Sequence, residues 1–251
     1  MRPDFKKLEG SFSTVGAVIN HLDVTTSTMD VAWKMAREGT PDGTVVVAEH
    51  QSDGRGRHDR AWVSEQGRDI LCSVVLRPRV ALAGDLLMLA ALAVIDVAAS
   101  FGVETGIKWP NDLLDSRSRK VVGILAELDS RQHKVQHVVL GVGINVNQAE
   151  FPPELPQAGS LCMTVGELDR AELLGSVVGS IEAWCARVEG DPKGVLDCWR
   201  THWGDRGCEV RVGERLGRAV DVRADGALLL ETDAGVEPVL SGDVIPVSRS
   251  L

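Results

Sequence analysis

The stretch KVVGILAEL (residues 120–128), followed after a short polar break by VQHVVLGVGINV (residues 135–146), decides the fold of this chain. Both segments are rich in β-branched residues and have the length of strands, so they predict two largely buried strands. Shorter runs of the same kind, which predict further strands, lie at residues 44–47, 70–76 and 107–109. The polar residues 115–119 lie between two of these strands and predict a mobile turn.

Three segments are predicted to be helical. Residues 23–39 have the pattern of a strand end that leads into a helix, with Ser27 and Asp30 as a capping-box-like start. Residues 81–101 form the longest apolar stretch, and the helix is predicted over residues 82–101. Because charges near the middle of a bilayer are costly, Asp85 and Asp96 within this stretch favour a buried helix over a membrane span. Residues 169–188 have the clearest helical period, with one face formed by Leu173, Leu174, Val177, Val178, Ile181, Trp184, Cys185 and Val188.

The pattern changes near residue 204. Five short β-like runs follow, at residues 208–212, 216–222, 227–230, 236–240 and 244–247. Turn sequences such as ADG at residues 224–226 separate them, and no helical period lies between them. This pattern predicts a small β-barrel, residues 204–251, packed on a larger domain of helices and strands, residues 1–203.

Composition and charge exclude several classes of protein. The 251 residues include 36 Asp and Glu but only 27 Lys and Arg, so the net charge is -9. This balance argues against a nucleic-acid partner and against adsorption to an anionic membrane. The first ten residues lack the apolar core of a secretory signal, and the five cysteines form no C-x-x-C pair. We therefore expect a cytoplasmic protein with free thiols. Cys198, His202 and Cys208 are too loosely spaced to predict a zinc site.

The segment QSDGRGRHDRAW (residues 51–62) carries the strongest chemical signal. Its two glycines permit close approach of a ligand to the backbone, and Arg55, Arg57 and Arg60 supply positive charge for phosphate or carboxylate groups. Taken alone, a segment of this kind is more often a solvated basic loop. It is a poor dinucleotide-binding motif, since Asp59 occupies the place of the third glycine, and the chain has no Walker A motif.

Three further segments carry chemical signals. KWPND (residues 108–112) brings a lysine, an amide and a carboxylate together at a strand end, where they could contact phosphates and magnesium or form a structural turn. Lys120 begins a strand in which Gly123 allows close approach. In GVGINVN (residues 141–147) the glycines interrupt a strand, which indicates that something packs against the backbone there.

Together, QSDGRGRHDRAW, KWPND, KVVGILAE and GVGIN resemble the biotin–protein ligases in order and spacing. The preceding TTSTMD (residues 25–30) matches the S-T-N-like segment of that family. The motifs cover roughly residues 20–150, and the likeness continues more loosely to the C-terminus. The resemblance implies an α+β fold, with a mixed-sheet catalytic domain like that of biotin and lipoate ligases and a small SH3-like C-terminal barrel.

The resemblance also implies an activity. Biotin would be activated with ATP to biotinyl-5′-AMP and then transferred to a lysine of the biotin carboxyl carrier domain of an acyl-CoA carboxylase. Mg²⁺ would accompany ATP, with a place near Asp112, and a homodimer through the sheet edge is a further hypothesis. The implied catalytic residues are Lys120, Arg55, Lys108 and Asp112. The implied biotin-binding residues are Ser27, Thr28, Gln51, Gly54, Arg55, Gly56, Arg57, Trp62, Lys120, Gly123 and Leu125. The implied nucleotide-binding residues are Arg57, Arg60, Asn111 and Asn145.

The sequence departs from the family pattern at two places. The family loop commonly reads G-R-G-R-x-G-R, so Asp59 adds a negative charge among the arginines and restricts the backbone. This departure predicts slower or differently gated closure of the loop. Met29 stands where asparagine is frequent in the family, which weakens any role assigned to that position.

Three other functions compete with that of a biotin–protein ligase. A biotin repressor would need a DNA-binding domain, for which the roughly 25 residues that precede Thr26 are too few. A lipoate ligase would have a similar fold, but the GRGR loop and the terminal β module favour biotin. A catalytically dead binding module would not need Lys108, Asp112 and Lys120, all of which are present.

Overall fold

The computed structural model describes residues 5–58, 60–77, 83–131 and 134–247. The N-terminal elements are the 3₁₀ helix η1 (Phe5–Leu8), β1 (Ile19–Leu22), α1 (Thr28–Arg37), β2 (Val45–Ala48), β3 (Ile70–Leu76) and α2 (Ala83–Ser100). They are followed by β4 (Thr105–Lys108), β5 (Asp112–Asp115), β6 (Lys120–Arg131), β7 (Lys134–Ile144), α3 (Cys162–Val165), α4 (Arg170–Gly190) and α5 (Pro192–Thr201). The C-terminal elements are β8 (Glu209–Val212), β9 (Arg215–Val222), β10 (Leu228–Thr232), β11 (Gly235–Val239) and β12 (Val244–Pro246).

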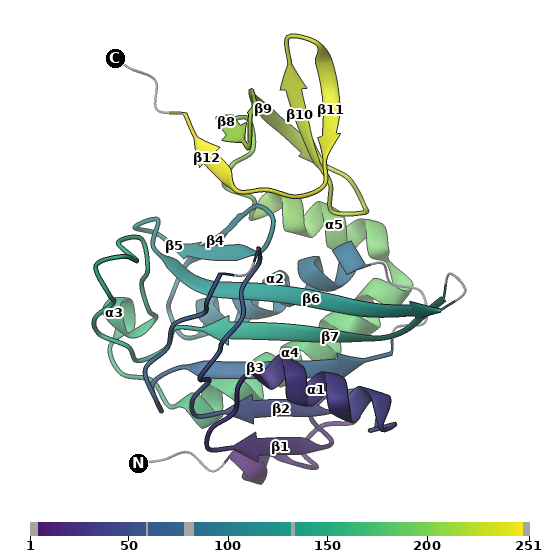
Figure 1. The fold of residues 1–251 in the computed structure, drawn as a ribbon, viewed down its shortest axis with the longest axis vertical. Coiled ribbons are helices and arrows are strands. Elements are labelled where there is room, and N and C mark those ends of the chain that lie inside the picture. Colours follow the sequence, from purple (N-terminus) through teal and green to yellow (C-terminus); the bar gives the residue numbers. More distant parts are fainter. Residues whose placement is uncertain (1–4, 59, 78–82, 132–133, 248–251) are drawn as a thin grey trace.

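The larger part of the molecule is built on a seven-stranded sheet in the order β1-β2-β3-β7-β6-β5-β4 (Figure 1). Strands β1 and β2 are parallel, and the other neighbours are antiparallel, so the sheet is mixed. Strands β6 and β7 form its longest ladder, in which Gly123 is the cross-strand partner of Gly143. The two strands predicted from residues 120–128 and 135–146 are confirmed, and the structure shows that they are neighbours.

The two faces of this sheet pack against different helices. On one face, α2 and α4 contribute the main hydrophobic core, which includes Leu89, Leu174 and Val177 together with Val45 and Val74 of the sheet. On the other face, α1 packs through a smaller cluster built from Met29, Ala32, Ala36, Val46, Val75 and Val139. Because neighbouring residues of a strand point to opposite faces, one strand such as β2 serves both layers. None of the helices in the described ranges has the length and apolar run needed to cross a membrane.

The smaller part is a five-stranded antiparallel sheet in the order β11-β10-β9-β8-β12. It is attached to the larger part by Trp109, whose indole Nε1 donates to the Gly226 carbonyl at 2.9 Å and whose backbone N–H donates to Asp205 at 3.0 Å. Arg200 of α5 makes two further bonds, at 2.8 and 2.9 Å, to the carboxylate of Asp221. The predicted fold class is confirmed, while the boundary between residues 203 and 204 stays a prediction.

Local structure differs from the sequence analysis at two places. Strands β1 (INHL) and β5 (DLLD) were not predicted because neither is a run of β-branched residues, unlike the equally short β2 (VVVA). The turn at residues 115–119, expected to be mobile, is tied together by hydrogen bonds. Asp115 accepts from the backbone N–H groups of Arg117 and Arg119 and from the Arg119 side chain, all at 2.8–2.9 Å.

Candidate active site

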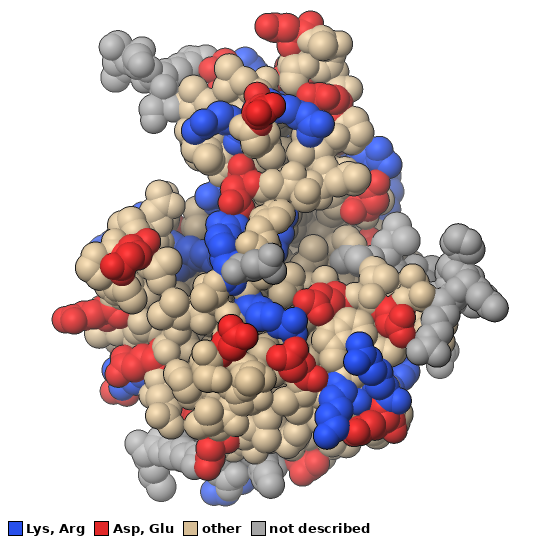
Figure 2. Space-filling view, in the orientation of Figure 1, with Lys and Arg blue, Asp and Glu red and all other residues tan. Residues whose placement is uncertain are grey.

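A cavity of about 440 Å³ opens on the face of the sheet that carries α1. Figure 2 shows basic side chains gathered in the hollow between the larger and smaller parts of the molecule. Most of the predicted site residues line this cavity, namely Ser27, Thr28, Gln51, Arg55, Gly56, Arg57, Arg60, Trp62, Lys108, Asn111, Asp112, Lys120, Gly123 and Leu125. Gly54 and Asn145 are predicted site residues that do not line it. Residues far apart in the sequence therefore meet in one place, although their individual roles remain predictions.

The floor of the cavity is a pair of glycines covered by an indole ring. A methyl group built on Gly123 would lie 2.6 Å from a ring carbon of Trp62, and one built on Gly143 would lie 2.7 Å away. Only glycine at these paired positions lets the ring lie flat on β6 and β7. Gly141 likewise faces Met29, whose sulfur would lie 2.6 Å from an added methyl. The prediction that something packs against the glycines of residues 141–147 is confirmed.

One end of the cavity is an uncharged polar corner at the N-terminus of α1. The side-chain oxygen of Gln51 accepts from the backbone N–H of Thr28 at 2.8 Å and from its hydroxyl at 3.0 Å. The Thr28 hydroxyl is in turn 2.8 Å from that of Ser73 on β3, a residue that sequence reasoning missed. Ser27 is buried and caps the helix by accepting from the N–H of Met29 at 3.3 Å. These bonds fix the amide of Gln51 with its NH₂ group as the remaining donor.

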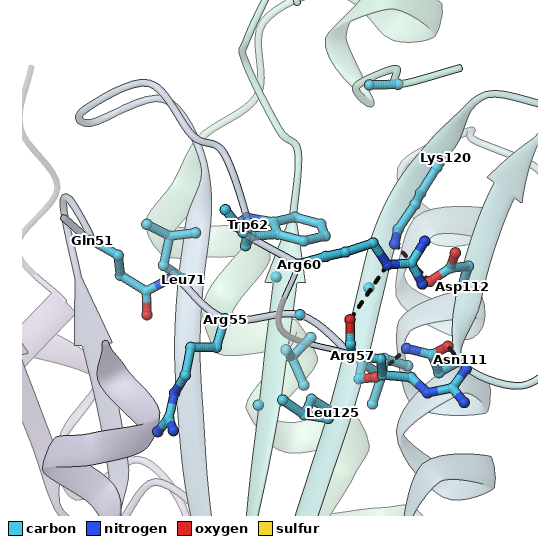
Figure 3. A pocket seen from close by; sticks show the side chains of 18 of the residues that line it. Gln51, Arg55, Arg57, Arg60, Trp62, Leu71, Asn111, Asp112, Lys120 and Leu125 are labelled. Carbon is cyan, nitrogen blue, oxygen red and sulfur yellow. Dashed lines mark hydrogen bonds and ion pairs between the residues drawn. The ribbon is translucent and has the colours of Figure 1, made fainter. Parts of the chain in front are cut away.

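The opposite end of the cavity is charged. Lys120 at the start of β6 forms an ion pair of 2.7 Å with Asp112 at the start of β5 (Figure 3). Its ammonium also lies 5.5 Å from the centre of the Trp62 ring. Strand register places Lys108 opposite Asp112, and Asp112 opposite Gly123, so the lysine, the carboxylate and the glycine floor form one row across three strands. A cation, an anion and a second cation are thus adjacent at the cavity wall.

The three arginines of the loop at residues 51–62 do not converge on one point. Arg55 pairs with Asp30 on α1 and points away from Lys120, as Figure 3 shows. Arg57 instead donates to the side-chain oxygen of Asn111 at 3.2 Å, and burial lowers its pKa although neighbouring carboxylates oppose that shift. Arg60 donates from Nη2 to Asp243 of the C-terminal sheet at 2.9 Å. The prediction about Asp59 falls on a residue outside those that the structure describes.

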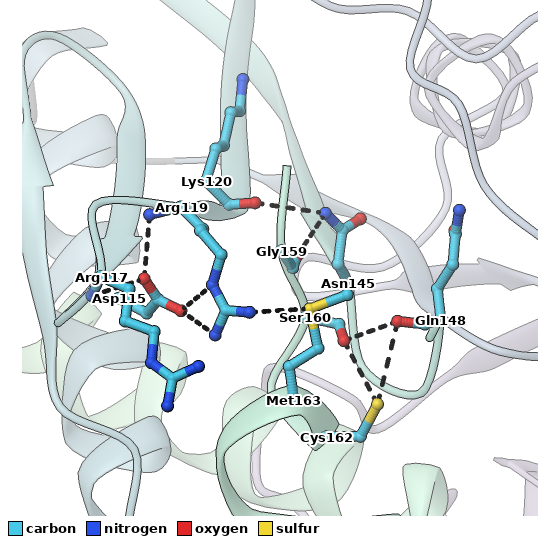
Figure 4. A network of polar contacts seen from close by, with 10 residues as sticks. All are labelled: Asp115, Arg117, Arg119, Lys120, Asn145, Gln148, Gly159, Ser160, Cys162 and Met163. Carbon is cyan, nitrogen blue, oxygen red and sulfur yellow. Dashed lines mark hydrogen bonds and ion pairs between the residues drawn. The ribbon is translucent and has the colours of Figure 1, made fainter. Parts of the chain in front are cut away.

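Residues 154–158 form a cavity wall that sequence reasoning missed. They are held against Lys120, whose backbone N–H donates to Gln157 at 2.7 Å and whose carbonyl accepts from Gly159 at 2.9 Å. Asn145 lies buried behind this wall and donates to the Gly159 carbonyl at 2.9 Å (Figure 4), and its contact with a nucleotide stays a prediction. A proline-rich segment between a strand and a helix is the signal that could have indicated the wall, since long irregular connections are often functional.

A polar network supports Lys120 from the other side. The guanidinium of Arg119 forms a 2.6 Å ion pair with the buried carboxylate of Asp115, and its Nη1 lies 3.0 Å from the sulfur of Met163 (Figure 4). Burial acts to raise the pKa of Asp115, but hydrogen bonds from Arg119 and Arg117 outweigh it and the pKa lies below its ordinary value. Asp115 is therefore ionised at neutral pH and holds in place Arg117 and Arg119, in the turn that precedes Lys120.

The cavity thus has a neutral polar corner, a glycine and indole floor, and a charged end with a second wall beside it. An elongated ligand with a polar head and an anionic tail fits this order, and the cations suit a second anionic ligand at the tail. Fold and site together are those of a protein that can hold anionic ligands by position and charge.

Comparison with known proteins gives the family. Residues 21–145 match the model of the biotin/lipoate A/B protein ligase family, and residues 205–245 match that of the biotin protein ligase C terminal domain. The chain is 36% identical over 242 residues to the bifunctional ligase/repressor BirA of Bacillus spizizenii, covering 92% of this chain and 74% of that protein. It is 34% identical to the biotin–[acetyl-CoA-carboxylase] ligase of Mycobacterium tuberculosis, over 98% and 97% of the two chains.

A solved structure agrees with these relatives. The biotin protein ligase of Aquifex aeolicus in complex with biotin and ATP matches with a TM-score of 0.78 and 28% identity, covering 91% of this chain and 97% of that one. The chain belongs to the biotin/lipoate A/B protein ligase family, and within it to the biotin protein ligases. The resemblance inferred from the four sequence motifs is confirmed, and the chain is an enzyme of the ligase class.

Proposed function

We propose that this chain activates biotin with ATP and transfers it to one lysine of the biotin carboxyl carrier protein of an acetyl-CoA carboxylase. The observation that carries the proposal is the Lys120–Asp112 pair, 2.7 Å apart, at the end of a cavity whose other end is neutral and polar. This order matches biotin, which has a neutral ureido ring at one end and a carboxylate at the other.

The polar corner would receive the ureido ring. Such a ring presents both N–H donors and a carbonyl acceptor, and the corner offers the hydroxyls of Ser27 and Thr28 and the NH₂ group of Gln51. The apolar remainder of biotin would lie on the floor formed by Gly123 and Trp62, beside Leu125. The carboxylate then reaches Lys120, whose ammonium neutralises it.

In the first step, a carboxylate oxygen of biotin attacks the α-phosphorus of ATP. A new oxygen–phosphorus bond forms, the bond to the bridging oxygen breaks, and pyrophosphate leaves with the electron pair. Both reactants are anions, so the reaction requires orientation and positive charge more than an enzyme nucleophile. Lys120, Lys108, Arg57 and Arg60 would supply that charge, together with Arg55 if it leaves its pair with Asp30.

Magnesium would enter with the triphosphate. Within the described ranges no three His, Cys, Asp or Glu residues are grouped as a metal cage, so phosphate oxygens would provide most of the ligands. Asp112 is the carboxylate at the charged end that could add a protein ligand, and the ion would neutralise charge on the phosphates. The adenosine part would lie along the wall at residues 154–158 beside Asn111.

In the second step, the amine of the carrier lysine attacks the carbonyl carbon of biotinyl-5′-AMP. The carbon–oxygen bond to phosphate breaks and AMP leaves. The attacking amine must lose a proton, and Asp112 is placed to accept it, since its carboxylate lies at the charged end of the cavity. The indole of Trp62 over the floor helps to exclude water from the reactive anhydride.

The experiment that tests this proposal uses purified chain, ATP, Mg²⁺, labelled biotin and a biotin carrier domain. We expect label on the carrier lysine, and far less when Lys120→Ala or Arg55→Ala replaces the native chain. Transfer of lipoate but not biotin, or binding of biotin without transfer, would contradict the proposed activity while leaving the fold assignment intact.

Quaternary structure and location are also proposals. A homodimer formed through a sheet edge would use β1, because β4 at the other end is covered: Ile107 pairs with the segment at His202 and Trp203. Sedimentation with and without biotinyl-5′-AMP tests this, and a monomer in both would contradict it. A cytoplasmic location follows from the reducing compartment that the thiols and the proposed substrates indicate.

A further inference from the structure

The glycine-rich loop at residues 51–62 is held at its tip by the C-terminal sheet. The two ends of the loop are joined by a hydrogen bond, in which the backbone N–H of Trp62 donates to the carbonyl of Gly54 at 2.8 Å. At its tip, the guanidinium of Arg57 bridges the two parts of the molecule: Nη1 donates to the side-chain oxygen of Asn111 at 3.2 Å and to the carbonyl of Gly242 at 3.3 Å. Arg60 adds the 2.9 Å ion pair with Asp243.

The two residues that receive these arginines occupy a well-defined position. Asp243 directly precedes β12, which pairs with β8 from Val244 onward. Gly242 has a φ of 139°, and a methyl group on it would lie 2.6 Å from a methyl carbon of Val212, so its backbone conformation requires glycine. The sheet that carries them is attached through Trp109, directly after Lys108. The acceptors are therefore fixed relative to the charged end of the cavity.

Charge favours the same contact. Burial acts to raise the pKa of Asp243, but Arg60, Arg57 and His58 together lower it by more. The pKa therefore lies below its ordinary value, and the group is a carboxylate at neutral pH. The other bond that the Arg60 side chain donates within the described residues is a long one, 3.4 Å from Nε to the Arg57 carbonyl. Without Asp243, the orientation of the Arg60 guanidinium would rest on that weaker contact alone.

We propose that Asp243 is a positioning residue, which aims Arg60 at the charged end of the cavity and, with the adjoining Gly242 carbonyl, holds Arg57 beside Asn111. The C-terminal sheet thereby forms part of the anion-binding site, although it contributes no residue to the cavity floor. The identity of the anion, the phosphates of ATP, rests on the proposed function, whereas the contact between the loop and the sheet does not.

Limited proteolysis tests the contact without any substrate. Trypsin cleaves after arginine, so peptides ending at Arg60 report how often this side chain leaves its partner in the folded chain. We expect Asp243→Asn to speed cleavage after Arg60 by about two- to fivefold, as for loss of a partly exposed ion pair. Asp243→Glu should restore protection. The matched control is Asp233→Asn, an exposed acid of the same sheet in the turn between β10 and β11.

Kinetics of biotinyl-5′-AMP formation then test the role in the reaction. We expect Asp243→Asn to raise KM for ATP by about two- to fivefold with little change in kcat or in KM for biotin. In an Arg60→Ala background the same substitution should have almost no further effect. Equal cleavage of Asp243→Asn and Asp233→Asn would overturn the contact, and additive effects with Arg60→Ala would overturn the positioning role. An inactive native chain would instead refute the proposed function and leave the proteolysis result standing.

Discussion

The two faces of the central sheet use the same strands for opposite purposes. On β7, Val142 and Ile144 point to the face covered by α2 and α4, and both are buried in the main core. Between and beside them, Gly141 and Gly143 point to the face of α1, where Met29 and Trp62 lie directly on the backbone. Alternation thus gives one strand a packed face that stabilises the fold and a second face without side chains, on which Met29 and Trp62 form the floor of the cavity.

The largest effect should come from the packed face. Ile144→Ala removes a fully buried side chain and leaves a cavity in the main core, which should lower the free energy of unfolding by about 2–5 kcal/mol. Urea unfolding at constant pH measures this. Biotin affinity of the fraction that stays folded should change little. If that affinity falls as steeply as stability does, the two faces are not independent.

On the ligand face, the charged end should dominate the chemistry. Lys120→Ala removes the ammonium that would neutralise the reacting carboxylate, and loss of one such group should lower the rate of biotinyl-5′-AMP formation about 10²–10³-fold. Biotin-dependent exchange of pyrophosphate into ATP measures this step. Stability should change little, because Lys120 is one-third exposed and its pair with Asp112 is partly solvated. Lys193→Ala, at an exposed lysine of α5, is the control and should retain full exchange activity.

The same contrast between faces explains what the sequence could reveal. Runs of β-branched residues predicted the long strands, and glycines at Gly123, Gly141 and Gly143 indicated close packing but not its occupant. The wall at residues 154–158 escaped prediction because it depends on pairing between Lys120 and Gln157, which no local pattern encodes. The same holds for the contact of Arg60 with Asp243, at the far end of the chain.

The glycine floor should be sensitive to a single methyl group. Gly143→Ala would place that group 2.7 Å from the Trp62 ring, so the indole must move. We expect biotin binding to weaken by about tenfold, the lower part of the cost of overpacking, with a smaller change in stability. Calorimetry measures affinity, and tryptophan fluorescence reports the displaced ring. Gly106→Ala on β4 is the matched control, because its added methyl would lie at an ordinary 3.6 Å from the nearest atom.

Both faces of the sheet contain charged residues, because the core side also has a buried ionic group. Arg170 at the start of α4 donates to Glu49 at 2.8 Å and to the Asp69 carbonyl at 3.1 Å, and Glu49 also lies 2.9 Å from a ring nitrogen of His21. Here each charged side chain is paired with a partner inside the protein. At the cavity, Lys120 and Asp112 satisfy each other while remaining partly exposed, so they stay open to a ligand.

Asp69 in that buried group provides the smallest and most specific effect. Burial raises its pKa to about 7, above the ordinary 3.8, although the Val146 N–H and Arg170 oppose the shift. The folded chain therefore holds a proton that the unfolded chain has released between those two values. The resulting contribution to stability is fully present below about pH 4 and is lost as pH rises through about 7.

Asp69→Asn should remove this dependence, since the amide keeps the oxygen that accepts from Val146 and cannot ionise. The substitution should lower the free energy of unfolding by less at pH 7 than at pH 5, and the difference between these two losses should be at least about 1 kcal/mol. Urea unfolding of both proteins at the two pH values measures that double difference and cancels the carboxylates they share. A double difference near zero would mean that Arg170 keeps Asp69 ionised in the fold, since neither the folded nor the unfolded chain would then take up a proton between the two pH values. The buried group on the core side would then stay charged at neutral pH. The charged end of the cavity would differ from it only in being partly exposed to solvent.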